Sequence, residues 1–194
     1  MTPIAFRIAR SSDAAEILQI YASYVEQTAI TLDTVVPSIA DFQTKITNTL
    51  ERYPFIVAVQ DNQIIGYAYT SAFNKRQAYD WSVELSIYLR QDVRHQGLGS
   101  RFYSLLEDIS KAQNITNLNA CITYPRSEDD PYVTLASPKF HAKRGFTTCA
   151  HFHKCAYKFD RWYDMIWMEK AILPHNKQVV PIKEFAQVAN QFFS

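Results

Sequence analysis

The sequence lacks any marked excess of charge of one sign. Its 20 Lys and Arg residues against 19 Asp and Glu residues give a formal net charge of +1. Its longest basic clusters are the pairs Lys75-Arg76 and Lys143-Arg144. Nucleic acids and anionic membrane surfaces are bound through larger basic patches. We therefore expect neither a nucleic acid nor a membrane among the partners.

Long apolar runs and paired cysteines are lacking too. No apolar stretch approaches the roughly 20 residues of a transmembrane helix, and the first ten residues do not contain the apolar segment of a secretory signal peptide. The three cysteines, Cys121, Cys149 and Cys155, are odd in number and have no CxxC spacing, which disfavours a disulfide framework and a zinc site. We therefore expect reduced, buried thiols and a cytoplasmic protein.

What is present is an ordered series of apolar patterns over 194 residues, 47% of them hydrophobic. Alternation with period two predicts strands over 4–8, 55–59, 64–69, 81–89, 118–122, 146–153 and 162–170. Helical spacing predicts helices over 14–25, 39–50, 100–112 and 138–144. This mixture of hairpins and crossovers favours an α+β fold with a mixed sheet.

The domain is expected to cover residues 1–172, followed by a tail over 173–194. Five apolar residues of the tail are spaced for an amphipathic helix: Ile182, Phe185, Val188, Ala189 and Phe192. Such a stripe normally docks, either on its own domain or on a second subunit. The sequence leaves both alternatives open.

One loop between a predicted strand and a predicted helix indicates a binding site. It consists of Arg94, His95, Gln96, Gly97, Leu98, Gly99 and Ser100. The first N–H groups of a helix have no intrahelical acceptor, and glycine lets the backbone approach a ligand closely. The pattern therefore predicts a pyrophosphate site at the helix start, although two glycines can also simply begin a helix.

Two better-known phosphate loops are absent. No G-x-x-x-x-G-K-[ST] segment occurs, which disfavours a P-loop kinase or ATPase. No G-x-G-x-x-G segment occurs, so a dinucleotide-binding Rossmann loop is not supported.

The loop resembles the coenzyme A pyrophosphate loop of the GCN5-related N-acetyltransferases (GNAT), whose signature is [RQ]-x-x-G-x-[GA]. The segments 51–54, 78–81 and 94–96 are similar to those of the phosphinothricin N-acetyltransferase subfamily. The resemblance implies a three-layer α/β/α arrangement with a mixed, mostly antiparallel central sheet and helices on both faces. It also implies acetyl-coenzyme A as cosubstrate, no metal, and a possible homodimer.

The resemblance assigns the cofactor contacts to two neighbouring segments. The main chain of the strand before the loop would hold the pantetheine arm and the acetyl group, through Ser86, Ile87, Tyr88 and Leu89. The loop from Arg94 to Ser100 would hold the pyrophosphate. The Asn that many relatives place before their last helix is missing from 132–137, where Thr134 or Ser137 would replace it. The preceding loop, 126–130, is longer than usual for the family.

Two titratable residues are predicted to serve the reaction. An amine attacks a thioester only when neutral, so a base must take its proton. The resemblance assigns that role to Glu84; the alternative is a strand carboxylate paired with a nearby arginine. The family's F-[YH]-x-x-x-G-F motif places His141 where many relatives have a tyrosine that protonates the leaving thiolate. His141 therefore acts as an acid, lines the acceptor site, or only packs.

The predicted acceptor pocket is lined by Leu32, Arg76, Tyr79 and Trp81. Arg76 would bind a substrate carboxylate, or it is an ordinary solvated arginine. His151 and His153, two apart on a strand, point the same way. A metal needs a third ligand, which the sequence does not indicate, so we interpret both as surface or pocket residues.

The leading hypothesis is an enzyme that moves an acetyl group from acetyl-coenzyme A to the primary amine of a small, amino-acid-like molecule. Two alternatives remain. One is a non-catalytic acyl-coenzyme A-binding module with a regulatory role. The other is an acetyltransferase acting on protein N-termini or lysines, which requires an open groove.

Overall fold

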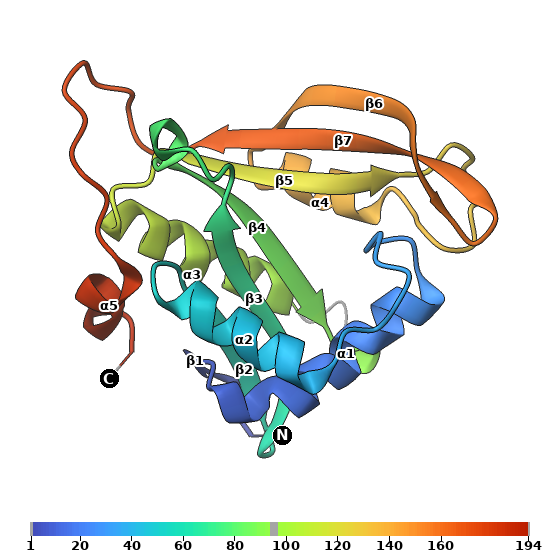
Figure 1. Ribbon diagram of the computed structural model, residues 1–194, viewed down its shortest axis with the longest axis horizontal. Helices are drawn as coiled ribbons and strands as arrows, with labels where there is room; N and C mark the ends of the chain where they lie inside the picture. The colour runs from blue at the N-terminus through green and yellow to red at the C-terminus, as the bar shows by residue number, and fades with distance from the viewer. Residues whose placement is uncertain (1, 94–96, 194) are drawn as a thin grey trace. The chain divides into compact units, whose positions relative to one another are not determined.

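The computed structural model describes residues 2–93 and 97–193 (Figure 1). Its strands are β1 (Ala5–Ile8), β2 (Phe55–Gln60), β3 (Gln63–Ala72), β4 (Ser82–Leu89), β5 (Asn117–Tyr124), β6 (Thr147–Lys158) and β7 (Arg161–Ala171). Its α-helices are α1 (Ala14–Gln27), α2 (Ile39–Leu50), α3 (Leu98–Ala112), α4 (Ala136–Lys143) and α5 (Phe185–Val188). Short 3₁₀ turns are η1 (Ser11–Asp13), η2 (Gln77–Tyr79), η3 (Gln91–Val93) and η4 (Ala189–Gln191). Every predicted strand and helix of the domain is present.

The strands follow the order β1-β2-β3-β4-β5-β7-β6 in one seven-stranded sheet of the described chain. The pairs β1–β2, β2–β3, β3–β4 and β6–β7 are antiparallel. Antiparallel neighbours need only short turns, and β2 joins β3 through Asp61 and Asn62, both with positive φ. The predicted α+β class with a mostly antiparallel sheet is confirmed.

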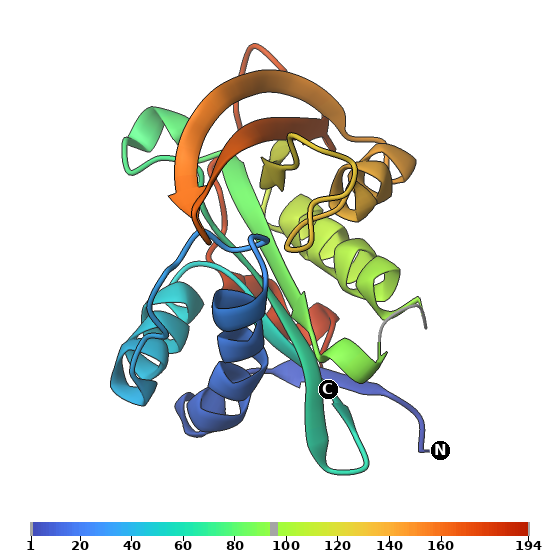
Figure 2. The same cartoon turned by 90° about the vertical axis from the view of Figure 1, so that its right-hand side faces the viewer.

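The chain forms two compact units, the first comprising residues 2–20, 37–118 and 171–193. In this unit the two faces of β3 and β4 carry different helices (Figure 2). The Phe42 ring of α2 packs edge-on against Tyr67, with centroids 6.2 Å apart. On the other face a Cβ added to Gly66 would lie 3.4 Å from Phe102 of α3. The helices therefore lie on both faces of this part of the sheet, as expected for a three-layer fold.

The start of α2 illustrates how the local sequence determines where a helix begins. The Ser38 hydroxyl accepts a hydrogen bond from the Asp41 N–H (3.1 Å), and the Asp41 carboxylate accepts one from the Ser38 N–H (3.0 Å). This reciprocal capping satisfies two groups that would otherwise lack intrahelical partners. The helix begins at Ile39, where the sequence predicts it.

The second unit comprises residues 21–36 and 119–170, including α4 and the β6–β7 hairpin. The predicted strand over 146–153 ended too early, because β6 continues to Lys158. Its pairing with β7 shifts register between Phe152 and Ala156, and Lys154 has a left-handed φ of 48°. Such a bulge interrupts the local alternation, so only the pairing with β7 defines the whole strand.

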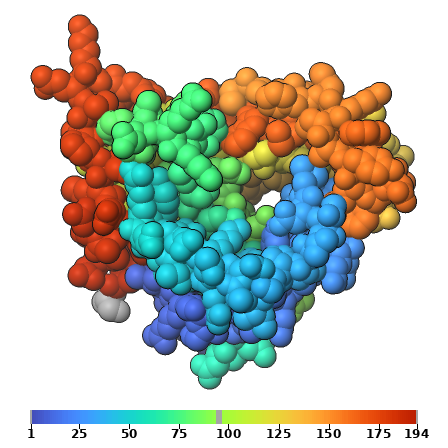
Figure 3. Space-filling view, viewed as in Figure 1, coloured from blue at the N-terminus to red at the C-terminus, as the bar shows by residue number. Residues whose placement is uncertain are grey.

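The C-terminal tail packs within the first unit. The Lys183 N–H donates to the Gln113 carbonyl (2.9 Å), and the Gln113 side-chain amide donates back to the Lys183 carbonyl (2.9 Å). Phe185 and Val188 are buried, although the helix there is short. Figure 3 shows the tail, in red, beside the segment around residues 73–81, in green.

The three cysteines are free thiols, but the prediction that they are buried was wrong. Cys149 and Cys155 lie on β6, the last strand of the sheet order, and Cys121 lies on β5. All three side chains are exposed. The prediction failed because the apolar pattern of a strand alone does not tell which of its faces another element covers. Among the helices of the described residues, none is long and apolar enough to cross a bilayer.

Candidate active site

The strand β4 positions the predicted base. Register with β3 places Glu84 opposite Ser71 and Ser86 opposite Tyr69. Paired residues share a face of the sheet, so Glu84, Ser86 and Tyr69 lie on the face that α2 covers. Glu84 is half-buried there, whereas its neighbours Val83 and Leu85 point to the other face and are buried.

The environment of Glu84 changes its acidity. Burial raises the pKa of Glu84 above its ordinary value, and the nearby charge of Lys45 opposes this in part. Lys45 extends from α2, and its ammonium group lies 4.6 Å from the centre of the Tyr69 ring. No arginine forms an ion pair with Glu84 within the described chain.

The rest of β4 supplies the predicted contacts of the cofactor arm. Ser86, Ile87, Tyr88 and Leu89 pair along β3 with Tyr69, Ala68, Tyr67 and Gly66. A Cβ added to Gly66 would lie 2.7 Å from Leu89 Cδ2 and 3.2 Å from the Tyr88 carbonyl oxygen. A larger residue at position 66 would therefore displace the Leu89 side chain and crowd the Tyr88 carbonyl. This role of Gly66 could not be predicted from the sequence, because it depends on the pairing partner.

The predicted pyrophosphate loop leads into α3. Arg94, His95 and Gln96 lie outside the described residues. Gly97 is the N-cap of α3 with a left-handed φ of 74°, and a Cβ added there would contact nothing within 4 Å. Leu98, Gly99 and Ser100 form the first turn, which holds no acidic residue. Their N–H groups have no acceptor inside the helix, so this end suits a phosphate group.

His141 lies in the second unit, on α4, and is buried. Its Nδ1 lies 2.8 Å from the Ser137 carbonyl oxygen. Because a carbonyl only accepts, Nδ1 carries the proton in this contact. Phe140 and Phe146 lie edge-on to the ring, at 5.6 and 5.3 Å between centroids. Burial lowers the pKa of His141, which the Ser137 hydrogen bond offsets only in part. A neutral imidazole held in this way suits packing better than proton donation.

His141→Leu therefore tests the packing role. We expect the free energy of unfolding to fall by about 0.5–1.5 kcal/mol, because the buried imidazole loses its hydrogen bond to the Ser137 carbonyl. We expect kcat to stay within about 10-fold of the native value, below the 10²–10⁴-fold typical of lost acid–base catalysis. Urea unfolding and steady-state kinetics measure the two effects. A folded variant with a larger loss of kcat would restore His141 as the proton donor.

Thr134, predicted to replace the missing asparagine, lies immediately before α4 and is exposed. Its hydroxyl accepts a hydrogen bond from the Ala136 N–H (3.3 Å). This contact orients the hydroxyl at the start of the helix. Its contact with the cofactor stays a prediction.

The predicted acceptor-pocket residues divide between the units. Leu32 is half-buried in the loop after α1, in the second unit. Arg76 and Tyr79 lie on the loop before β4 in the first unit, and both are exposed. Tyr79 packs against Phe73, with ring centroids 5.8 Å apart. Arg76 and Tyr79 are thus both accessible on the loop between β3 and β4.

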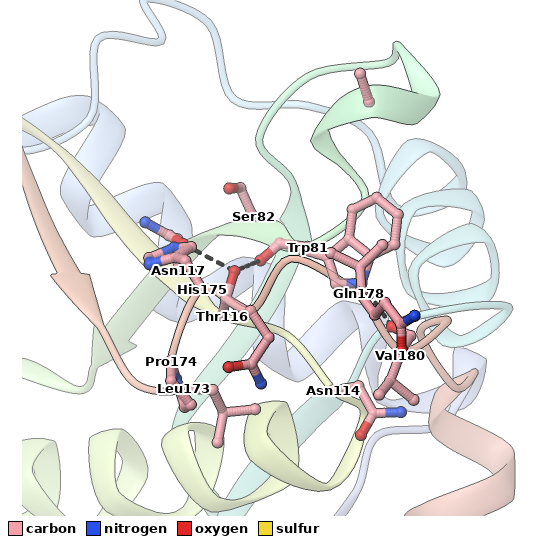
Figure 4. A pocket seen from close by; sticks show the side chains of 13 residues that line it. Trp81, Ser82, Asn114, Thr116, Asn117, Leu173, Pro174, His175, Gln178 and Val180 are labelled. Carbon is pink, nitrogen blue, oxygen red and sulfur yellow. Dashed lines mark hydrogen bonds between the residues drawn. The ribbon is translucent and has the colours of Figure 1, made fainter.

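Trp81 faces the tail. Its indole N–H donates to the Val180 carbonyl (2.7 Å). A cavity of about 480 Å³ lies beside it (Figure 4). Its walls are Ala78, Trp81, Ser82, Asn114, Thr116, Asn117, Leu173, Pro174, His175, Asn176, Gln178, Val179 and Val180. Of the predicted acceptor-pocket residues, Trp81 borders this cavity, whereas Arg76, Tyr79 and the predicted base Glu84 are not among its walls.

Comparison with known proteins identifies the family and the fold. Residues 6–167 match the family model of the acetyltransferase (GNAT) domain. The phosphinothricin N-acetyltransferase of Streptomyces viridochromogenes is 28% identical over 96% of this chain and 97% of its own length. The L-methionine sulfoximine/L-methionine sulfone acetyltransferase of Pseudomonas aeruginosa is 27% identical over 87% and 94%. A phosphinothricin acetyltransferase from Sinorhizobium meliloti, solved with acetyl-coenzyme A, superposes with a TM-score of 0.80 at 27% identity, covering 95% and 99%.

The fold and these matches define the class of the protein, an N-acetyltransferase that uses acetyl-coenzyme A as its cosubstrate. Within this class the chain belongs to the GNAT acetyltransferase family. The predicted family and fold are confirmed. The roles of the individual site residues stay predictions.

Proposed function

We propose that the protein acetylates the α-amine of a small, amino-acid-like acceptor, with Glu84 as general base. The observation that carries the proposal is Glu84 itself, a half-buried carboxylate on β4 whose pKa burial raises. A base works best when its pKa approaches the working pH. The acceptor class is supported by the similarity to enzymes named for phosphinothricin and for methionine derivatives.

The proposed reaction proceeds by direct attack. Glu84 takes a proton from the acceptor ammonium group, directly or through water. The neutral nitrogen forms a bond to the thioester carbonyl carbon, and the carbon–sulfur bond breaks as the tetrahedral intermediate collapses. The amide nitrogen gives up its second proton, directly or through water, to the departing coenzyme A thiolate. The N–H groups at the start of α3 hold the pyrophosphate, and the backbone of Ser86 to Leu89 holds the arm.

An acceptor screen tests the proposal. The purified protein is incubated with acetyl-coenzyme A and single amines, and released thiol is measured with a disulfide reagent. The panel contains phosphinothricin, methionine sulfoximine, the common amino acids and peptides with free N-termini. We expect release with amino-acid-like amines. Binding of coenzyme A without release from any amine would instead favour a regulatory binding module, and release with peptides alone would favour a protein acetyltransferase.

Lys45 tunes the proposed base. In Lys45→Met the opposing positive charge is removed, so the pKa of Glu84 rises further above its ordinary value. The lower limb of the kcat/KM profile against pH should therefore move to higher pH. Lys111→Met is a matched control, because Lys111 pairs with Glu107 on the surface of α3. A profile that does not move in Lys45→Met would contradict the assignment of that limb to Glu84.

The remaining expectations belong to the same proposal. Three free thiols are consistent with a reducing cytoplasm. A homodimer is supported by aromatic side chains on the last strand pair of the sheet order, where Phe152, Tyr157 and Trp162 are about half exposed. Arg76, exposed on its loop, is proposed to bind the acceptor carboxylate. The catalytic domain is proposed to end near residue 172, with the docked tail completing it.

A further inference from the structure

The β6–β7 hairpin brings together three side chains that acetyl transfer does not use. His151 Nε2 and His153 Nδ1 each lie 3.0 Å from the same carboxylate oxygen, Oδ2 of Asp164. All three ligand atoms lie within 4.8 Å of one another. Two imidazole nitrogens and one carboxylate oxygen thus converge on one point within the second unit.

The bulge in β6 creates this convergence. Phe152 pairs with Met165 and Ala156 pairs with Tyr163, so residues 153–155 together face Asp164 alone. Lys154 adopts a left-handed conformation there, and its N–H donates to Asp164 Oδ1 (2.9 Å). A bulge re-aims neighbouring side chains, and here it leaves both histidines directed at the carboxylate.

The two carboxylate oxygens of Asp164 have different partners. Oδ1 accepts from the Lys154 N–H and faces Arg126 Nε at 3.3 Å. Within the described residues, the hydrogen-bond partners of Oδ2 are the two histidines. Outer hydrogen bonds of this kind orient a ligating carboxylate and are typical of metal sites. The charge of Arg126 lies on the Oδ1 side, away from the atom that would bind an ion.

The separations fit a common ion. Zinc binds imidazole nitrogen and carboxylate oxygen at about 2.0–2.2 Å, so two ligands of a tetrahedral ion lie roughly 3.3 Å apart. The 3.0 Å from each nitrogen to Oδ2 must open slightly, and the two nitrogens, which lie within 4.8 Å of each other, must reach the same separation of about 3.3 Å. The facing nitrogens now carry hydrogen, because a carboxylate only accepts. Each neutral ring would move that proton to its other nitrogen when an ion binds.

We propose that His151, His153 and Asp164 bind a divalent transition-metal ion, with zinc as the best match, and that the ion fastens the bulge of β6 to β7. Two imidazoles disfavour magnesium and calcium, which take oxygen ligands. The His153 and His151 side chains are 73% and 37% exposed, so an ion can enter from solvent and water completes its coordination. The ion has no part in acetyl transfer, and the proposal stands apart from the proposed function.

Zinc binding to the protein without a histidine tag tests the proposal. The protein is stripped with a chelator, dialysed, and titrated with Zn²⁺ in competition with a chromogenic chelator. We expect one tightly held ion per chain and a higher melting temperature with zinc than without it. His153→Ala, at the most exposed ligand, should weaken zinc binding by at least about 10-fold. His151→Ala should do the same.

His175→Ala is the matched control. His175 is another exposed histidine, which contacts Asn117 in the first unit, and its loss should leave the affinity unchanged. Co²⁺ gives a second readout, because a four-coordinate ion absorbs visible light strongly, and His153→Ala should remove that band. The proposal is overturned if the native protein holds no zinc in the competition. It is equally overturned if His151→Ala and His153→Ala, folded by circular dichroism, bind zinc as the native protein does.

Discussion

Glu84→Gln is expected to lower kcat by about 10²–10⁴-fold, the range that general base catalysis contributes. Glutamine keeps the size and polarity of the side chain but does not accept the ammonium proton. Glu84 lies half-buried on the α2-covered face of β4. Initial rates at saturating acetyl-coenzyme A, with the best acceptor from the screen, give kcat.

The affinity for coenzyme A makes this result specific. The proposed cofactor contacts are main-chain groups of β4 and the start of α3, so calorimetry should give the same Kd for Glu84→Gln and the native protein. Glu51→Gln, an exposed glutamate just beyond α2, should leave both kcat and Kd unchanged. A native kcat in Glu84→Gln would remove Glu84 as the base.

Phe102→Ala is expected to lower the free energy of unfolding by about 3–5 kcal/mol, the usual cost of deleting a buried aromatic ring. Phe102 is a fully buried residue of α3, and its ring lies edge-on to the Phe6 ring, with centroids 4.9 Å apart. Proteins are typically stable by only about 5–15 kcal/mol, so this one change removes a large fraction. Urea unfolding followed by circular dichroism measures it.

Two variants separate the packing effect from a general loss of apolar surface. Phe102→Leu retains most of the volume and should lose less than Phe102→Ala does. Val179→Ala, at a tail residue that is 59% exposed, should change stability by no more than about 0.5 kcal/mol. A loss below about 1.5 kcal/mol in Phe102→Ala would mean that the surrounding core closes over the cavity.

Several features could be predicted from the sequence because they depend on neighbours along the chain. The alternation around Glu84 predicts a strand with one polar face, and β4 has that face. Helical spacing predicts a helix over 39–50, and α2 spans those residues. Gly97, in the loop that follows the strand, predicts a helix start, and Gly97 is the N-cap of α3. Each of these signals is local.

Other features depend on which strands become neighbours. Lys45 of α2 acts on the pKa of Glu84 of β4 only because α2 packs on the same face of the sheet, so this effect could not be predicted from the sequence. The cysteines were expected in the interior, yet the strands that carry them leave their side chains exposed. Local periodicity does not reveal which face another element covers.

The amino-acid sequence by itself determined the order of strands and helices and the position of the glycine-containing loop, because short-range periodicity and a local motif specify them, and the family resemblance added Glu84 as the candidate base. Only the tertiary structure decided the surroundings of those groups. His151 and His153 were visible as a pair on one strand, but Asp164 joins them from β7 through the pairing at the bulge. A hydrogen-bonded partner strand supplies that third ligand, and no pattern within a single strand encodes it.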